Sequence, residues 1–301
     1  MQRRRFLKNA GLASIGAPLL ATRARGNEFP IGLELITVLA LLANDFRGTL
    51  EAVADIGYRE VETLGSLGHL PDQVHTILAG CHLTTPAQHL VPDDLFNVYQ
   101  SWDRGALTMA EALTQLREGY ALQRIDEIIE QGISRARLLR QQYLVWPVLF
   151  EEHVASRRAL EKLTAAFNVA GQMCCQNSLT FAFHNGSRAF QRIGPDLAYD
   201  VILQETDPQT VKMEWDTYYA AKASVDVREY FGRYPGRFKL LHLKDIDDRG
   251  EITDLGRGKI DFPPLVRAAR QVGVTHFFVE HDRARDPLLT AQSSFKYVRG
   301  L

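Results

Sequence analysis

The feature that most constrains the fold is an alternation of short β-rich runs with longer helical patterns, which continues from residue 31 to residue 279. In the longer segments, apolar residues recur every three to four positions, as on the buried face of a helix. Strands that are separated by helices pair in parallel, so this order predicts a (β/α)8 barrel. The expected strands are Ile31–Ile36, Tyr58–Thr63, His82–Gln88, Tyr143–Val148, Thr180–Phe183, Val211–Trp215, Phe238–Leu241 and Thr275–Val279. The clearest helical patterns are Gly48–Ile56, Arg157–Cys175, Val225–Phe231 and Pro263–Val272.

The length of the chain suits one such barrel. A barrel of this kind takes roughly 250 residues, and the chain has 301, of which 46% are hydrophobic. We therefore expect a single barrel domain over residues 26–301. The stretch from Ser101 to Gln131 is longer than a simple connection needs, and we expect it to lie over the barrel mouth. A Rossmann-type sheet is the competing fold, but no Gly-rich phosphate loop follows the first expected strand.

The N-terminus has the order of a twin-arginine export signal, predicted over residues 1–25. Arg3-Arg4-Arg5-Phe6-Leu7-Lys8 is followed by an apolar stretch from Ala10 to Ala21 and by small residues around Ala24. The apolar stretch is too short and too broken to span a bilayer. The prediction is a periplasmic protein that meets the membrane only transiently, through this signal. The alternative is a basic N-terminus with no targeting role.

Overall charge argues against nucleic acid as a partner. The formal net charge is −1, which gives no overall positive field for holding a polyphosphate backbone. The expected partner is a small molecule.

Candidate functional residues stand where four apolar runs end. Residues at the C-terminal ends of barrel strands converge on one mouth. The polar residues at these ends are His184, Asp216, His242 and Glu280. Two imidazoles and two carboxylates aimed at one point predict a divalent metal (Mn, Zn, Co, Fe or Mg) rather than Ca. Taken singly, each has a structural alternative: a hydrogen-bonded histidine, a helix N-cap or a solvated carboxylate.

An ordered series of short motifs resembles the sugar phosphate isomerase/epimerase family of xylose-isomerase-like barrels. Each motif is weak alone, but together they cover roughly residues 31 to 301 in the family's order. The motifs are Gly32-Leu33-Glu34-Leu35, Gly57-Tyr58-Arg59-Glu60-Val61-Glu62, Phe183-His184-Asn185, Glu214-Trp215-Asp216, Leu241-His242-Leu243-Lys244-Asp245, Gly256-Arg257-Gly258-Lys259-Ile260-Asp261-Phe262 and Val279-Glu280-His281-Asp282.

The resemblance implies a metal at the mouth, held by the same four strand-end residues. It also implies that His89 faces the substrate and that Lys244 lies beside the sugar. Glu62 is a further pocket candidate, with pairing to an Arg or Lys as the alternative, and Asn185 is placed with the substrate-binding residues. Two positions depart from the family pattern: a histidine, His184, stands where well-studied epimerases carry a glutamate, and Gly186 stands where a second histidine is common.

The function expected from these residues is metal-dependent isomerisation or epimerisation of a sugar through an enediolate. A metal stabilises the enediolate while a base moves the proton. Glu280 is expected as ligand and base, with His184 or Lys244 acting on the other side. Three alternatives stay open: a lyase or hydratase acting on an oxidised sugar, a phosphodiesterase of the endonuclease IV type, and an exported carbohydrate-binding protein without turnover. The endonuclease would need a richer metal cluster and basic loops.

Overall fold

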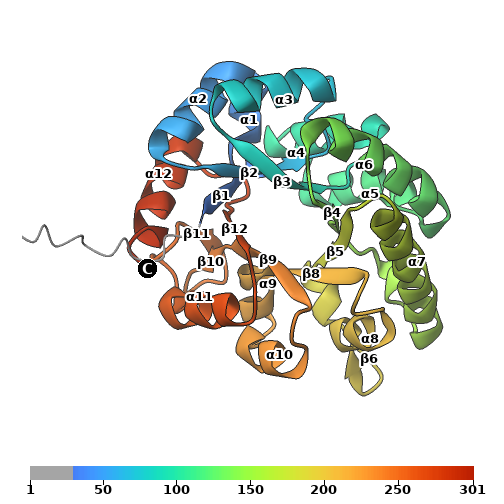
Figure 1. The fold of residues 1–301 in the computed structure, drawn as a ribbon. Coiled ribbons are helices and arrows are strands. Elements are labelled where there is room, and N and C mark those ends of the chain that lie inside the picture. Colours follow the sequence, from blue (N-terminus) through green and yellow to red (C-terminus); the bar gives the residue numbers. More distant parts are fainter. Residues whose placement is uncertain (1–29) are drawn as a thin grey trace, which may run out of the picture.

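The computed structural model describes residues 30–301, in which eight parallel strands close into one barrel with helices around it (Figure 1). The order around the barrel is β1-β12-β9-β8-β5-β4-β3-β2. The barrel strands are β1 (Ile31–Glu34), β2 (Glu60–Leu64), β3 (Thr84–His89), β4 (Tyr143–Trp146), β5 (Thr180–His184), β8 (Val211–Asp216), β9 (Phe238–Leu243) and β12 (His276–Val279). This confirms the predicted (β/α)8 barrel.

Helices connect successive strands and cover the outside of the barrel (Figure 1). They are α1 (Leu39–Leu42), α2 (Phe46–Ile56), α3 (Pro71–Gly80), α4 (Phe96–Asp103), α5 (Met109–Gly119), α6 (Ile125–Leu139), α7 (Arg157–Gln176), α8 (Ala198–Glu205), α9 (Thr217–Lys222), α10 (Val227–Arg233), α11 (Phe262–Gln271) and α12 (Pro287–Val298). There are also two short hairpins, β6 (Arg192–Ile193) with β7 (Asp196–Leu197) and β10 (Asp245–Ile246) with β11 (Ile252–Thr253).

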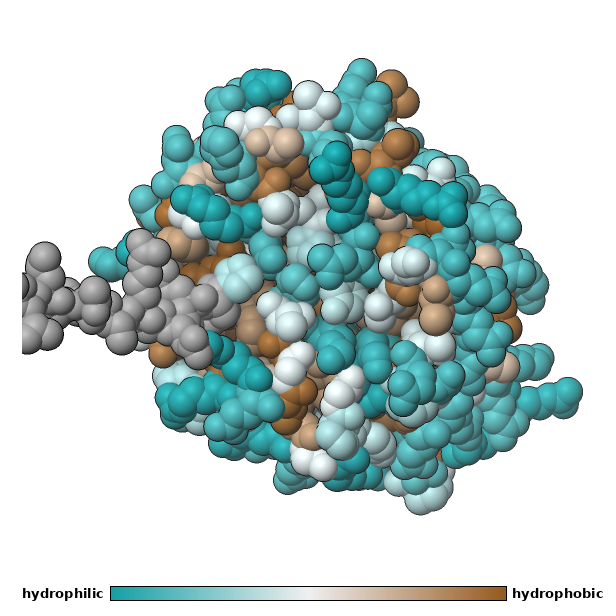
Figure 2. Space-filling model, viewed as in Figure 1, coloured by the Kyte–Doolittle hydropathy of each residue, from teal (hydrophilic) through white to brown (hydrophobic). Residues whose placement is uncertain are grey.

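The helix α7 shows how the sequence specifies these elements. It begins after Ser156, whose side chain accepts a hydrogen bond from the amide of Ala159 and so caps the first turn. Leu160, Leu163 and Phe167 follow at helical spacing and are fully buried. Hydrophilic residues cover most of the molecular face that Figure 2 shows.

The observed strand boundaries differ from the predicted ones by one or two residues, and two of these differences have clear local causes. The first strand ends at Glu34 because Leu35–Val38 turns into a 3-10 helix, which the Glu34 side chain caps by accepting from the amide of Ile36. The third strand begins at Thr84 because His82 adopts a left-handed conformation with φ of 56°. An extended strand cannot include a residue in that conformation.

The long connection after β3 contains two additional helices. α4 and α5 pack against each other, and α4 also contacts α1. The hydroxyl of Tyr120, at the end of α5, donates to the carbonyl of Leu90, which directly follows β3. The elaboration expected from Ser101 to Gln131 is therefore anchored at the C-terminal side of the barrel, where the strand ends meet.

The barrel interior is filled in layers. A middle layer of apolar side chains comes from five strands: Ala87, Val145, Ala182, Leu240 and Phe278. Below it, toward the N-terminal strand ends, His276 Nδ1 and Glu60 Oε2 lie 2.9 Å apart. Above it lie the polar residues of the mouth. Side chains two positions apart on a strand share a face, so the residue two positions along from an inward-facing residue also points into the barrel.

Gly32 belongs to this interior, and we expect Gly32→Ala to destabilise the barrel. A Cβ at Gly32 would lie 2.3 Å from Cδ1 of Phe278, inside the closely packed middle layer. Overpacking of this kind costs about 1–3 kcal/mol. Urea denaturation should show a lower midpoint for this variant.

The matched control is Gly232→Ala in α10, where an added Cβ meets nothing within 4 Å. Because alanine favours a helix over glycine, this control should be unchanged or more stable by up to about 1 kcal/mol. Equal midpoints for Gly32→Ala and wild type would show that the ring of Phe278 simply moves aside.

The predicted export signal over residues 1–25 lies outside the described residues and stays a prediction. Within residues 30–301, no helix combines the length and apolar character needed to cross a membrane.

Candidate metal centre

The C-terminal ends of four neighbouring strands, β5, β8, β9 and β12, meet inside the barrel mouth. They carry the four residues predicted as ligands: His184, Asp216, His242 and Glu280. One nitrogen or oxygen atom of each lies within 4.8 Å of the others, and all four side chains are buried. The structure thus brings these residues together, while metal binding itself stays a prediction.

His184 presents a free ring nitrogen to this centre. Its Nδ1 lies 3.1 Å from the carbonyl oxygen of Pro147. Because a carbonyl only accepts hydrogen bonds, Nδ1 carries a ring proton, and in the neutral imidazole Nε2 is the nitrogen with the lone pair. Nε2 is buried without a partner among the described residues and lies 3.6 Å from Oδ2 of Asp216.

The two carboxylate oxygens of Asp216 have different surroundings. Oδ1 accepts from the amide of Tyr219 at 2.9 Å and caps α9. Oδ2 is buried and has no hydrogen-bond partner in the described chain. Asp216 therefore caps a helix, which was its structural alternative, and its second oxygen also faces the centre.

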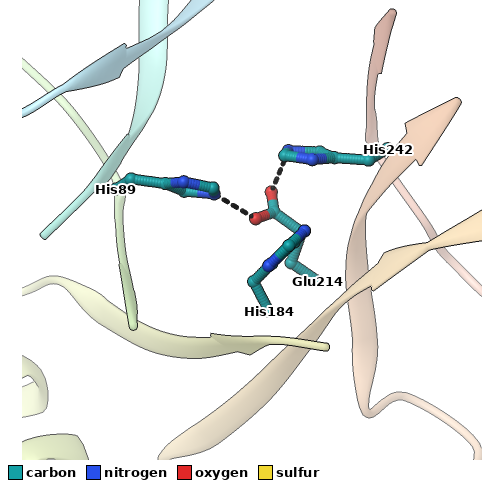
Figure 3. A group of neighbouring side chains, drawn as sticks. All are labelled: His89, His184, Glu214 and His242. Atoms are coloured by element: carbon teal, nitrogen blue, oxygen red, sulfur yellow. Dashed lines mark hydrogen bonds and ion pairs between the residues drawn. The ribbon is translucent and has the colours of Figure 1, made fainter. Parts of the chain in front are cut away.

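Glu214 lies at the heart of the cluster, and the sequence prediction did not include it. It forms a second possible metal-holding group with His89, His184 and His242, again with atoms within 4.8 Å of one another. Its carboxylate points between two imidazoles (Figure 3). Oε2 is 2.9 Å from His89 Nε2, and Oε1 is 3.3 Å from His242 Nε2. Its signal in the sequence was its position two residues before Asp216, which places both on the inner face of β8.

His242 is held from both sides. Its Nδ1 is 2.7 Å from Glu280 Oε2, and its Nε2 is 2.6 Å from Glu62 Oε2. Glu62 is fully buried and contacts histidines, since His89 Nε2 is also 3.7 Å away. The pairing with Arg or Lys that was the alternative for Glu62 is therefore not what the structure shows.

The mouth contains an excess of buried negative charge. Glu34, Glu62, Glu214, Asp216 and Glu280 are buried carboxyl groups, and Lys244 is the one lysine among the buried polar residues of the described chain. Asp282, with a side-chain exposure of 13%, adds a sixth carboxyl group beside Lys244. Burying charge without compensation is expensive. Bound protons or a bound cation must balance this set.

The carboxyl groups respond differently to this environment. Burial raises the pKa of Glu62 to about 8, and neighbouring Glu214 adds to the rise. Burial also raises the pKa of Glu34 well above its usual value, with Glu280 and Glu62 adding to it. Burial works in the same direction on Glu280, but Lys244 and His242 outweigh it and hold the Glu280 pKa well below its usual value. Glu280 is therefore ionised, as a metal ligand must be.

Lys244 lies on the same side of the centre as Glu280. Its Nζ is 3.0 Å from Glu280 Oε1, 2.8 Å from Asp282 Oδ2 and 3.8 Å from Asp216 Oδ2. Burial opposes its charge, but Asp282 and Glu280 hold the Lys244 pKa well above its usual value. Lys244 is thus an ammonium group that can donate hydrogen bonds but not accept a proton.

Asn185 supports the strand end beside it. Its side-chain nitrogen donates to the carbonyl of Asp216 at 3.1 Å, and its side-chain oxygen accepts from the Asp216 amide at 3.0 Å. The residue is fully buried. Both ends of its amide are therefore engaged in holding Asp216, and the predicted contact of Asn185 with substrate stays a prediction.

The loop after β9 is tied together by one carboxylate. Asp245 accepts from the backbone amides of Ile246, Gly256, Gly258 and Ile260 at 2.9–3.2 Å. A Cβ at Gly258 would lie 2.3 Å from Asp245 Oδ1, so only glycine fits there. Asp245 therefore joins two motifs that are separate in the sequence and fixes the loop that follows His242 and Lys244.

The donor set fits a divalent cation. Five buried atoms of the mouth have no hydrogen-bond partner among the described residues: Glu34 Oε1, Glu62 Oε1, His184 Nε2, Glu214 Oε1 and Asp216 Oδ2. Unsatisfied buried acceptors are rare in native proteins, and a cation satisfies several at once. Mixed imidazole and carboxylate ligation suits a transition metal.

Comparisons with known proteins agree with the fold. No protein-family model matches the chain. A sugar phosphate isomerase/epimerase from Parabacteroides distasonis ATCC 8503 superposes with a TM-score of 0.70 at 22% identity, covering 94% of this chain and 98% of that one. An L-ribulose 3-epimerase gives 0.64 at 15% identity, covering 90% and 93%. The fold is that of the xylose-isomerase-like barrels.

Several curated inosose dehydratases are similar to the chain in sequence. An inosose dehydratase from Geobacillus thermodenitrificans (strain NG80-2) is 23% identical over 194 residues, which are 57% of this chain and 63% of that protein. The chain thus matches less than two thirds of the relative's length.

Proposed function

We propose that this protein is a metal-dependent enzyme that removes a proton beside the carbonyl of a sugar or sugar-derived ketone, as an isomerase or epimerase. The observation that carries the proposal is a pair of buried atoms, His184 Nε2 and Asp216 Oδ2, which lie 3.6 Å apart and have no hydrogen-bond partner within residues 30–301. His184, Asp216, His242 and Glu280 would hold the ion. A bound divalent ion would stabilise the negative charge that develops on the substrate oxygens.

The residues around the centre have distinct tasks in this proposal. Glu280 is ionised and accepts the proton that leaves the substrate carbon. Lys244 keeps its ammonium group 3.0 Å from Glu280 and donates to a substrate oxygen. His89 projects from β3, which is separated from β12 by β2 and β1 on the shorter path around the barrel. Because Glu214 accepts from its Nε2, the other ring nitrogen of His89 is left to contact substrate.

Dehydration is the second candidate, and the likeness to an inosose dehydratase favours it. The first step is the same: a base takes the proton beside the carbonyl. The electron pair then expels a hydroxyl group from the adjacent carbon, and the hydroxyl leaves as water after it accepts a proton. The two reactions differ only in the fate of the enediolate.

One experiment tests both candidates. Metal-loaded protein should be incubated in heavy water with inosose and with unoxidised and oxidised sugars, and the products should be followed by NMR. Deuterium at a substrate carbon supports proton abstraction, and loss of water supports the dehydratase. Substrates that bind but stay unlabelled and unchanged would instead indicate a carbohydrate-binding protein.

We expect His89→Gln to weaken substrate binding while metal content stays intact. The glutamine amide can still donate to Glu214, but the ring nitrogen that faces the mouth is lost. A lost hydrogen bond of about 1–3 kcal/mol corresponds to a rise in KM of roughly 5- to 150-fold. Steady-state kinetics and elemental analysis check this. Loss of metal in His89→Gln would mean that the ion binds at the group containing His89 and Glu214.

A further inference from the structure

We propose that Glu62 is a positioning residue that fixes the proton of His242 on Nε2, so that His242 binds the ion through Nδ1. This assignment differs from the substrate contact expected from the sequence. It rests on the metal site of the proposed function.

The two nitrogens of His242 face different groups of residues. Nδ1 faces Glu280, at 2.7 Å from Oε2, and Glu280 belongs to the group with His184 and Asp216. Nε2 faces the other way, toward Glu62 at 2.6 Å and Glu214 at 3.3 Å. An ion held together with Glu280 and Asp216 therefore meets His242 at Nδ1.

A neutral imidazole carries one proton, and a metal occupies the nitrogen without it. Binding through Nδ1 thus requires the proton on Nε2. Glu62 Oε2 is the nearest oxygen to Nε2, at 2.6 Å, and the side chain is fully buried, so water does not compete for the proton. Glu214 Oε1 is farther from Nε2, at 3.3 Å, and the other oxygen of Glu214 accepts from His89. Residues that orient a ligand histidine in this way typically contribute ten- to a hundredfold to metal affinity.

The test compares two substitutions at the same position. Glu62→Met removes the acceptor, while Glu62→Gln removes the charge but keeps a side-chain oxygen that can accept from Nε2. Mn²⁺ affinity, measured by isothermal titration calorimetry, should fall by about ten- to a hundredfold in Glu62→Met. Glu62→Gln should recover part of this loss. Equal losses in both variants would show that only the charge of Glu62 acts, and would overturn the assignment.

The matched control lies two residues earlier on the same strand. Glu60 also contacts an imidazole, His276 Nδ1 at 2.9 Å, but at the opposite end of the barrel. Glu60→Met should leave Mn²⁺ affinity unchanged. An equal loss in this control would indicate a general effect on folding and would also overturn the assignment.

A second measurement reads the proton directly. In protein loaded with Zn²⁺ and labelled with ¹⁵N-histidine, the His242 signals, assigned by their loss in His242→Asn, should show a protonated Nε2. A protonated Nδ1 would place the ion on the side of Glu214 and overturn the proposal. Wild-type protein that takes up neither metal would overturn the proposed function as well, whereas tight binding that is indifferent to Glu62→Met would overturn this assignment alone.

Discussion

Asp216→Asn should leave the protein folded but unable to retain a divalent metal. Asparagine caps helices about as well as aspartate, so the bond from the Tyr219 amide to Oδ1 survives. The change falls on Oδ2, the buried oxygen without a partner, which becomes an amide nitrogen that cannot bind a cation. Loss of a direct ligand should exceed the ten- to hundredfold cost of losing a supporting residue, so we expect affinity to fall by more than about a hundredfold.

The measurement is elemental analysis of wild type and variant after equal metal loading, with circular dichroism to compare the folds. His242→Ala should lose metal as well. Asp45→Asn is the control, because Asp45 Oδ1 caps α2 in the same way, at 2.9 Å from the Gly48 amide. Equal metal content in Asp216→Asn and wild type would remove this site and the main physical support for an enzyme.

Glu280→Gln should reduce turnover by at least about a hundredfold, the lower end of what general acid–base groups contribute. The substitution preserves the shape of the side chain but removes the charge that Lys244 and His242 hold in place. Both metal affinity and proton abstraction depend on that charge. The rate should be measured at saturating metal on whichever substrate exchanges deuterium. Full activity with metal bound would place the base elsewhere.

The fold could be predicted because its signal repeats along the chain. Each strand needs only a short apolar run and each helix only a regular spacing, and both can be recognised locally. The same logic found the four strand-end residues. It erred at His82, where the left-handed backbone after α3 leaves no mark in residue type.

The partners within the site could not be predicted in this way. Glu214 lies 125 residues from His89, and Glu62 lies 180 residues from His242. Which carboxylate meets which imidazole depends on how strands face one another across the barrel, and no local pattern contains that information. The two-residue period of a strand is enough to place Glu214 on the same face as Asp216, but it cannot show that Glu214 lies between two histidines.

Asp245 links two of the sequence motifs on which the family resemblance rests. Its carboxylate holds the amides of Gly256, Gly258 and Ile260, so the two most recognisable motifs of the chain are the halves of one loop clamp. The first of these motifs also carries His242 and Lys244 into the candidate centre, whereas the second takes part in the clamp through its backbone amides. Because one carboxylate holds both halves of the loop, grafting it onto another barrel should succeed only when residues 245–260 are moved as a unit.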